Sequence, residues 1–173
     1  MIEIRNVKLE DAESLLNIYK YYVLKTAITF ELEVPSLEEF KERIKNITNN
    51  YPYIVLEDDN KIVGYAYSNV FKGREAYKYS SEVTIYLDKD YYKKGYGKLL
   101  YNELEAKAKE KGIKNLYACI ASPVKEDIYL NNNSELFHNH LGYKKIGTFN
   151  KCGYKFNTWY NMIWMEKIIG KHE

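Results

Sequence analysis

The sequence is poor in the residues that crosslink proteins or bind metal ions, and it has no long apolar run. It contains two cysteines, Cys119 and Cys152, and three histidines among 173 residues. Two cysteines do not make a disulfide framework, and no zinc-ligand spacing joins them to the histidines, so we expect no metal. No apolar stretch approaches the roughly 20 residues that cross a bilayer. The first residues also lack the basic and then apolar pattern of a signal peptide, so we expect a cytoplasmic protein that does not bind membranes.

The chain has no excess of charge of one sign. Lys and Arg number 26 against 24 for Asp and Glu, and the formal net charge is +2. So small a net charge gives no general attraction to nucleic acid, and any basic site must be local. Hydrophobic residues make up 46% of the sequence, which is enough for one globular core. We expect a single domain at 1–169 and a short tail at 170–173.

Helical and strand patterns alternate along the chain and predict an α/β domain with a mixed sheet. A helix should begin at Ser36, which forms a capping box with Glu39, and another should end at Gly112. Strands are expected at 2–6, 53–57, 62–70, 81–87, 116–121, 143–149 and 159–167, and further helices at 11–22 and 134–141. Cys119 lies in one of the apolar strands, which predicts a buried thiol. The 19 tyrosines are spread over the whole length, so we interpret them as a feature of composition and not as an aromatic binding surface.

The segment 80–98 combines a strand, a glycine turn and the start of a helix. In the strand, Glu82, Thr84 and Tyr86 fall on one face and the alternate residues on the other. The turn reads Lys93-Lys94-Gly95-Tyr96-Gly97-Lys98. Its two glycines let the backbone approach a ligand, and the first helical turn offers an anion N–H groups that have no intrahelical partner. The segment therefore predicts an anion site.

A Gly-x-Gly pair alone is more often an ordinary tight turn, and the other common phosphate motifs are absent. There is no Gly-x-x-x-x-Gly-Lys-Ser/Thr sequence and no Gly-x-Gly-x-x-Gly after an N-terminal strand, which excludes P-loop ATPases and dinucleotide-binding domains. Together with Ile85-Tyr86-Leu87, the turn instead resembles the coenzyme A site of the GCN5-related N-acetyltransferases (GNAT), whose motif is Gln/Arg-x-x-Gly-x-Gly/Ala. Tyr92 stands where that family usually has Gln or Arg, which removes one polar contact.

Further matches, in the right order over nearly the whole chain, resemble the phosphinothricin acetyltransferase-like branch of this family. They are Ile4-Arg5, Asp11-Ala12, Ile18-Tyr19, Thr26 to Glu31, Gly64-Tyr65-Ala66, Arg74 to Tyr77, Glu82, Asn131 with Ser134, His138, Leu141-Gly142-Tyr143, Gly153 to Phe156 and Trp159. The resemblance implies the acyl-CoA N-acyltransferase fold, with about six to seven strands and about four helices. It also implies acetyl-CoA as co-substrate, a homodimer, and a small amino-acid-like acceptor such as phosphinothricin, methionine sulfoximine or methionine sulfone.

The resemblance gives two steps of acetyl transfer a candidate residue. Glu82 is the expected general base for the acceptor amine, with a surface glutamate as the alternative. His138 is expected to face the site, because Phe137 and Leu141 can face the core. It would then protonate the leaving thiolate or orient the amine. The alternative, which we weigh equally, is a helix histidine bonded to a loop carbonyl.

The resemblance also implies the binding residues. A backbone N–H near 85–87 should donate to the thioester carbonyl, and the lysines of the turn should surround the pyrophosphate with positive charge. The expected coenzyme A contacts are Ile85, Tyr86, Leu87, Lys93, Lys94, Gly95, Tyr96, Gly97, Lys98 and Asn131, with Asn132 and Asn133 as alternatives to the last. The expected acceptor contacts are Phe30, Glu31, Arg74, Glu75 and Tyr77. Among these, the Arg74 guanidinium suits a carboxylate or a phosphinate.

Other functions of the same fold stay open. A protein or polyamine acetyltransferase would differ in its acceptor, and Arg74 disfavours a polyamine. A coenzyme A binding module without catalysis is the alternative from a different class. Tyr92 is in its favour, and Glu82 and His138 are against it. Nucleic-acid binding ranks last, because the net charge gives no basic face.

Overall fold

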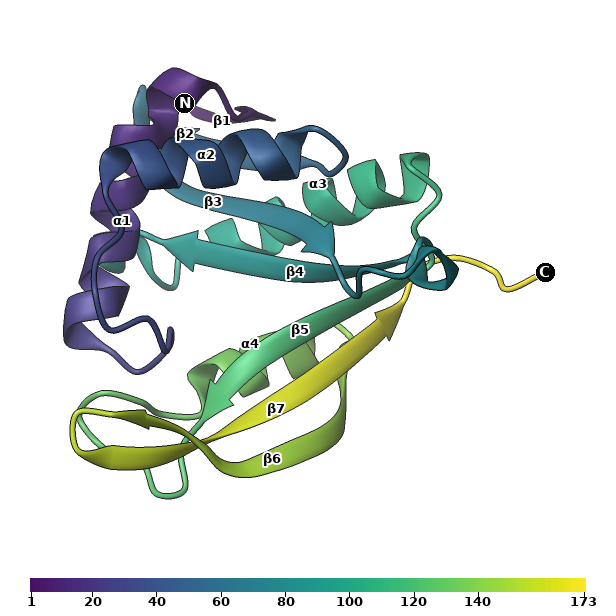
Figure 1. Ribbon diagram of the computed structural model, residues 1–173. Coiled ribbons are helices and arrows are strands. Elements are labelled where there is room, and N and C mark those ends of the chain that lie inside the picture. The colour runs from purple at the N-terminus through teal and green to yellow at the C-terminus, as the bar shows by residue number, and fades with distance from the viewer. The chain divides into compact units, whose positions relative to one another are not determined.

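The computed structural model describes residues 1–173 and contains seven strands and four α-helices (Figure 1). The chain forms two compact units, of which the first consists of 1–19, 35–116 and 168–173 and the second of 20–34 and 117–167. Helix α1, Ala12–Lys25, begins in the first unit and ends in the second. The single domain expected at 1–169 stays a prediction. No helix combines the length and the apolar character that crossing a membrane requires.

Four antiparallel strands form the sheet of the first unit, in the order β1-β2-β3-β4. β1 spans Ile2–Asn6, β2 Tyr53–Asp58, β3 Lys61–Val70 and β4 Ser80–Leu87. These strands confirm the expected ones to within a residue at each end. Asp59 and Asn60 connect β2 to β3 at φ of +48° and +65°. Both side chains tolerate a left-handed backbone, which favours the tight two-residue hairpin.

Helix α2, Leu37–Thr48, begins as the sequence predicted. The Ser36 hydroxyl accepts a hydrogen bond from the Glu39 N–H at 3.1 Å, which caps the first turn. The Glu39 carboxylate, however, pairs with Arg43 at 2.8 Å, one turn further along the helix. Only the Ser36 half of the expected capping box is therefore confirmed.

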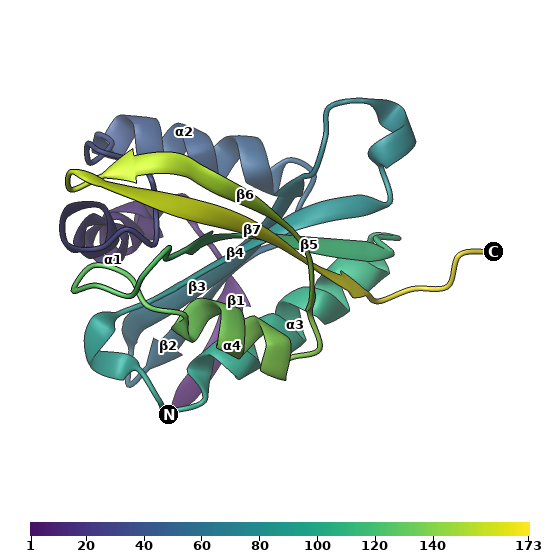
Figure 2. The same ribbon diagram turned by 90° about the horizontal axis from the view of Figure 1, so that it is seen from below.

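Helix α3, Tyr96–Glu110, lies on the side of β3 and β4 opposite to α2 (Figure 2). It approaches the sheet closely at Gly64, where an added Cβ would lie 3.3 Å from Leu100 Cδ1. Leu100 and Leu104, which belong to the predicted apolar stripe, are completely buried. The helix ends before Gly112, whose φ of +81° is left-handed, as expected of a helix-stopping glycine.

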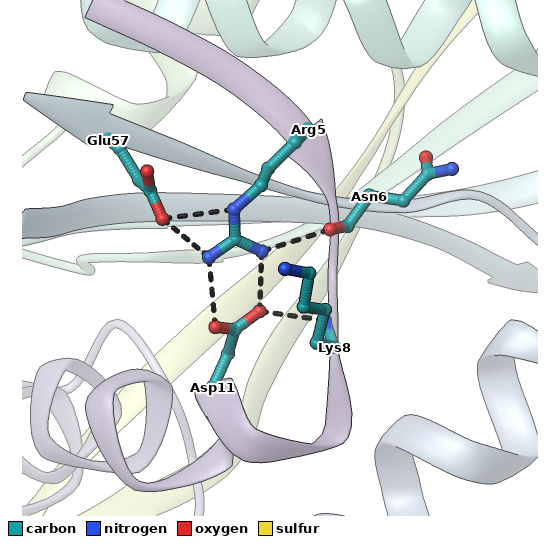
Figure 3. Close-up of polar contacts among 5 residues, drawn as sticks. All are labelled: Arg5, Asn6, Lys8, Asp11 and Glu57. Carbon is teal, nitrogen blue, oxygen red and sulfur yellow. Dashed lines mark hydrogen bonds and ion pairs between the residues drawn. The ribbon is translucent and has the colours of Figure 1, made fainter. Parts of the chain in front are cut away.

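A partly buried ion cluster joins β1, β2 and the turn that precedes α1 (Figure 3). The Arg5 guanidinium donates to both carboxylate oxygens of Asp11, at 2.8 and 3.0 Å, and its Nε donates to Glu57 at 3.0 Å. The Lys8 N–H also donates to Asp11, at 2.7 Å. Burial by itself would raise the pKa of Asp11, but the hydrogen bonds from Arg5 and Lys8 outweigh it and lower that pKa. Charge-assisted hydrogen bonds thus fix the entry into α1.

The second unit contains three strands, in the order β5-β7-β6, and the short helix α4. β5 spans Asn115–Ser122, α4 Asn133–His140, β6 Lys144–Lys155 and β7 Thr158–Ile168. β6 is longer than the strand expected at 143–149. Its register with β7 shifts between Phe149 and Gly153 and then continues to Lys155. This irregularity, in a polar stretch with a glycine, interrupts the alternation by which a strand is recognised in a sequence.

The β6–β7 hairpin turns at Phe156 and Asn157, at φ of +53° and +56°. The Phe156 ring stacks on that of Tyr129, with centroids 4.0 Å apart and an interplanar angle of 14°. The loop that carries Tyr129 is held to β7 by the Tyr160 hydroxyl, which donates to Asp127 at 2.6 Å. The 127–130 loop and the hairpin tip therefore form one packed structure.

Cys119 is exposed, so the prediction of a buried thiol is wrong. Its neighbours Ala118 and Ile120 in β5 are buried. Because side chains alternate along a strand, burial of these two residues turns Cys119 to the opposite face.

Candidate active site

β4 places an ionisable side chain, Glu82, beside aromatic ones. The register sets Glu82 opposite Asn69 and Tyr86 opposite Tyr65, and directly opposed residues share a face of the sheet. The predicted grouping of Glu82 with Tyr86 is thus confirmed. Burial raises the pKa of the Glu82 carboxyl, an effect that Lys72 opposes in part. A carboxylate with a raised pKa is a stronger base, which suits proton removal near neutral pH.

The same strand directs two backbone amides away from β3. The Asp88 N–H donates to the Val63 carbonyl of β3 at 2.8 Å. In an antiparallel ladder, N–H groups two residues apart point to the same edge. The Tyr86 N–H therefore points toward β3, and those of Ile85 and Leu87 point to the other edge of β4. Of the three residues expected to contact the coenzyme here, only Ile85 and Leu87 direct their backbone N–H groups away from β3, where a ligand could accept a hydrogen bond from them.

The glycine turn leads into α3 through a left-handed residue. Gly95 immediately precedes the helix with φ of +80°, and an added Cβ would meet nothing within 4 Å. Its role is thus conformational, since other residues are strained at this φ. The Leu99 N–H bonds to the Gly95 carbonyl, whereas the amides of Tyr96, Gly97 and Lys98 come too early in the helix to have an intrahelical acceptor. These three N–H groups are the anion-binding element of the turn.

Some side chains of the turn hold its structure, and others are exposed and can contact a ligand. The Tyr96 hydroxyl donates to Asp58 at 2.6 Å, and this hydrogen bond is the main reason why its pKa rises to about 12. Tyr96 is buried, so its side chain anchors the turn and only its backbone can contact a ligand. Lys94 Nζ lies 4.4 Å from the Tyr91 ring centroid, a cation–π contact. Lys93 and Lys98 are exposed.

A pocket of about 520 Å³ opens on the aromatic face of the first unit. We call it the tyrosine pocket. Its lining residues are Tyr19, Phe40, Arg43, Asn46, Ile47, Asn50, Tyr51, Tyr53, Tyr65, Tyr67, Asn69, Val70 and Tyr86. Six of the tyrosines thus line one pocket, and the interpretation that they form no binding surface stays a prediction. The Tyr65-x-Tyr67 spacing within a strand is the signal that could have revealed this grouping, because it puts both rings on one face.

The expected acceptor contacts at 74–77 lie in an exposed loop of the first unit. The Tyr77 N–H donates to the Arg74 carbonyl at 3.0 Å, and the Tyr77 ring packs edge-on against Phe71 at 5.9 Å. Glu75 pairs with Lys78 at 3.5 Å. The Arg74 guanidinium is exposed, which leaves it accessible to an anionic ligand.

The other expected acceptor contacts, Phe30 and Glu31, belong to the 26–31 loop of the second unit. The Phe30 ring packs so closely on Gly153 that no Cβ fits there. The buried Lys155 donates from Nζ to the Thr29 carbonyl at 2.8 Å. Burial lowers the pKa of Lys155 to about 8, although nearby Glu31 favours its charge. The sequence did not indicate a role for Lys155, because a lysine next to a turn is usually exposed to solvent.

His138 corrects one expectation. Its side chain is buried rather than turned to an open site, and its Nδ1 lies 2.7 Å from the Ser134 carbonyl one turn earlier in α4. The ring packs edge-on against Phe137 and Tyr143, at 5.2 and 5.3 Å. Burial lowers its pKa to about 4, although the hydrogen bond to the Ser134 carbonyl by itself would raise it. The expected titration near neutrality is therefore wrong, and the alternative of a carbonyl-bonded helix histidine fits, with a carbonyl of the helix itself.

Asn131 orders the start of α4. Its Oδ1 accepts a hydrogen bond from the Asn133 N–H at 3.0 Å, while the Asn132 N–H donates to the Glu126 carboxylate at 3.1 Å. All three asparagines are exposed. The geometry gives Asn131 a local turn-forming role, and its contact with coenzyme A stays a prediction.

Comparisons with known proteins identify the family. Residues 4–164 match the acetyltransferase (GNAT) domain family. The chain is 28% identical to the phosphinothricin N-acetyltransferase of Streptomyces viridochromogenes, over 93% of this chain and 84% of that protein. It resembles an N-acetyltransferase structure from Staphylococcus aureus with a TM-score of 0.90, at 27% identity over 98% of this chain and 99% of the other.

A solved phosphinothricin acetyltransferase of Sinorhizobium meliloti, in complex with AcCoA, is also similar. Its TM-score is 0.89 at 31% identity, over 98% of this chain and 89% of that one. The similarity confirms the expected acyl-CoA N-acyltransferase fold over nearly all of the sequence. The chain belongs to the GNAT family of N-acetyltransferases, in its phosphinothricin acetyltransferase-like branch.

Proposed function

We propose that the protein transfers the acetyl group of acetyl-CoA directly to the amine of a small amino-acid-like acceptor. The observation that carries the proposal is β4. This strand holds Glu82, with its raised pKa, and two amides, those of Ile85 and Leu87, that point away from β3. The AcCoA complex of the Sinorhizobium meliloti relative supports the choice of donor. Phosphinothricin, methionine sulfoximine and methionine sulfone are candidate acceptors.

In the proposed reaction Glu82 removes a proton from the acceptor ammonium, directly or through a water. The free amine attacks the thioester carbonyl and forms a tetrahedral intermediate. The N–H of Ile85 or Leu87 donates to its oxyanion, an interaction worth about 3–4 kcal/mol in comparable sites. The C–S bond then breaks, Glu82 returns its proton to the departing thiolate, and the nitrogen of the new amide releases its second proton to solvent. His138 supports α4 in this scheme, because its buried neutral ring has no proton to give near pH 7.

The glycine turn is the proposed site of the coenzyme's pyrophosphate. The amides of Tyr96, Gly97 and Lys98 would donate to it at the positive end of the α3 dipole. Lys93 and Lys98, both exposed, would add charge without a large desolvation cost. Tyr92 removes a side-chain contact that the family usually has, yet the remaining site is mostly backbone.

The test is thiol release from acetyl-CoA with a panel of amino acids, their analogues, polyamines and peptides. Glu82→Gln should lower kcat by roughly 10²–10⁴-fold, the usual contribution of a general base. Glu38→Gln is the matched control, since that glutamate is exposed on α2. An unchanged kcat in Glu82→Gln would remove Glu82 from the mechanism. Coenzyme binding without thiol release for any acceptor would favour the non-catalytic module, and release with spermidine or peptides alone would favour the other acetyltransferases.

We also propose that β6 forms a homodimer interface. Nine consecutive residues of this strand, 144–152, are exposed, although one edge of the strand pairs with β7. Ile146 and Phe149 are 54% and 53% exposed, and an unpaired strand edge that carries apolar side chains can pair with a second chain. Light scattering after size-exclusion chromatography should give the mass of a dimer for the parent protein and that of a monomer for Phe149→Glu. A monomeric parent protein would contradict the proposal.

A further inference from the structure

The tyrosine pocket has an aromatic wall that the proposed reaction does not yet use. The rings of Tyr65 and Tyr67 lie at an interplanar angle of 9° with centroids 6.5 Å apart, and Tyr53 lies 4.7 Å from Tyr67. Tyr86 continues this wall 5.7 Å from Tyr65. Tyr53 and Tyr65 are buried, whereas Tyr67 and Tyr86 are partly exposed, so a planar or extended apolar group in the pocket would contact mainly these last two rings and gain from stacking on them.

The wall is uncharged. Burial raises the pKa of Tyr53 and of Tyr65 well above the ordinary range, so both hydroxyls keep their protons. No acidic side chain lines the pocket, and its one charged lining residue is Arg43, whose guanidinium also pairs with Glu39 of α2 at 2.8 Å. Apart from the tyrosine hydroxyls, the other polar side chains of the lining are the amides of Asn46, Asn50 and Asn69. A cationic polyamine would find no counter-charge among the lining residues, whereas a carboxylate would find the guanidinium of Arg43.

One end of the pocket adjoins the proposed general base. Asn69, which lines the pocket, is directly opposite Glu82 in the β3–β4 pair, and the Cβ atoms of such pairs are about 4.5–5.5 Å apart. An acceptor with its amine at this end can meet Glu82 while its side chain lies along the tyrosines. A volume of about 520 Å³ is far more than the short polar side chain of phosphinothricin fills.

We propose that the tyrosine pocket binds the acceptor's side chain and selects amino acids whose side chain is aromatic or long and apolar. This inference rests on the proposed acetyl transfer. It changes the expected order of acceptors, because alanine, phosphinothricin and methionine sulfone leave most of the aromatic wall uncovered. The Arg43 guanidinium would bind the acceptor's carboxylate at the rim.

Steady-state thiol release with phenylalanine, tryptophan, alanine, methionine sulfone and phosphinothricin tests the order. The kcat/KM for phenylalanine or tryptophan should exceed that for each of the other three at least tenfold. Asn46→Trp fills the pocket from an exposed helical position. It should raise the KM for phenylalanine at least tenfold and leave the KM for acetyl-CoA unchanged. Lys45→Trp, at the adjacent exposed position that does not line the pocket, should change neither.

Arg43→Gln separates recognition of the carboxylate from that of the side chain. It should raise the KM for phenylalanine and spare that for 2-phenylethylamine, which lacks the carboxylate. Equal effects on both acceptors would remove Arg43 from carboxylate binding and contradict that part of the inference.

The outcomes distinguish the inference from the reaction itself. Acetylation of methionine sulfone or phosphinothricin with no preference for aromatic acceptors would overturn the inference and leave the proposed function intact. If no acceptor releases thiol, the proposed function fails, and calorimetry then tests the pocket alone. Phenylalanine should bind to the parent protein and to Lys45→Trp but not to Asn46→Trp. Absence of binding, or equal binding to all three, would overturn the inference.

Discussion

Gly153→Ala tests how the 26–31 loop packs on the β6–β7 hairpin. A Cβ at this position would lie 2.6 Å from Cζ and 2.8 Å from Cδ2 of the Phe30 ring. Carbon atoms in good contact are about 3.5–4.0 Å apart, so the ring or the strand must move by about 1 Å. The ring has little room to move, because it also packs against Tyr160, with centroids 6.4 Å apart.

The expected cost follows from two opposing effects. Overpacking of a well-filled site typically costs about 1–3 kcal/mol. Alanine also restricts the unfolded chain and so returns about 0.5–1 kcal/mol in a strand. We expect a net loss of about 1–2 kcal/mol in the free energy of unfolding. For a chain of this size the loss corresponds to a fall in Tm of about 2–8 °C.

Urea unfolding of Gly153→Ala beside Gly147→Ala measures the effect. Gly147 lies in the same strand, and a Cβ there would meet nothing within 4 Å. This control should be as stable as the parent protein or slightly more stable. A rise in the acceptor's KM in Gly153→Ala alone would in addition support Phe30 as an acceptor contact. If both variants unfolded at the same urea concentration, Phe30 would not pack on Gly153 and the reasoning would be wrong.

Three further predictions concern charge. Arg5→Ala leaves two carboxylates without their shared partner, each under 20% exposed, and should cost about 2–3 kcal/mol. Lys45→Ala, which breaks an exposed ion pair, is the control and should cost under about 0.5 kcal/mol. Equal urea midpoints for the two variants would contradict the cost expected for Arg5→Ala. Because the folded pKa of His138 is about 4 and the unfolded one about 6.5, stability should fall as pH drops between these values. The loss in the free energy of unfolding is at most about 3 kcal/mol. His138→Phe should make this free energy depend less on pH, and an equal pH dependence in both proteins would contradict the prediction. Added salt should weaken acetyl-CoA binding, and less so in Lys98→Gln; a salt-independent dissociation constant would rule out the lysine contacts.

Local patterns predicted the elements of the fold well. The Asp59-Asn60 turn, the Ser36 cap and the stop at Gly112 were all readable, because each depends on residues close in sequence. The extension of β6 to Lys155 was not, since a bulge breaks the alternation that signals a strand. The faces of β4 could be assigned from their period of two, which is why Glu82 and Tyr86 were grouped correctly.

The environment of the site residues was much less accessible. The helical pattern favoured Phe137 and Leu141 for the core, yet both are only partly buried and His138 is buried. Its packing against Tyr143 is a contact that this pattern does not reveal. The tyrosine pocket depends on the register of β2, β3 and β4 and on the helices above them, which bring together residues distant in the sequence. No pattern within a single segment carries that information.

Phe156 adopts a left-handed backbone that bulky residues avoid, with φ of +53°, at a cost of about 1–3 kcal/mol. Its ring stacks on Tyr129 at 4.0 Å, and this contact offsets the strain. Evolution of the chain is constrained as a result. A mutation of Tyr129 removes the ring contact and leaves the strained backbone at Phe156, whereas Phe156→Gly removes the strain and the contact together. We therefore expect viable descendants to reach a new hairpin tip through position 156 first, and to vary position 129 only afterwards.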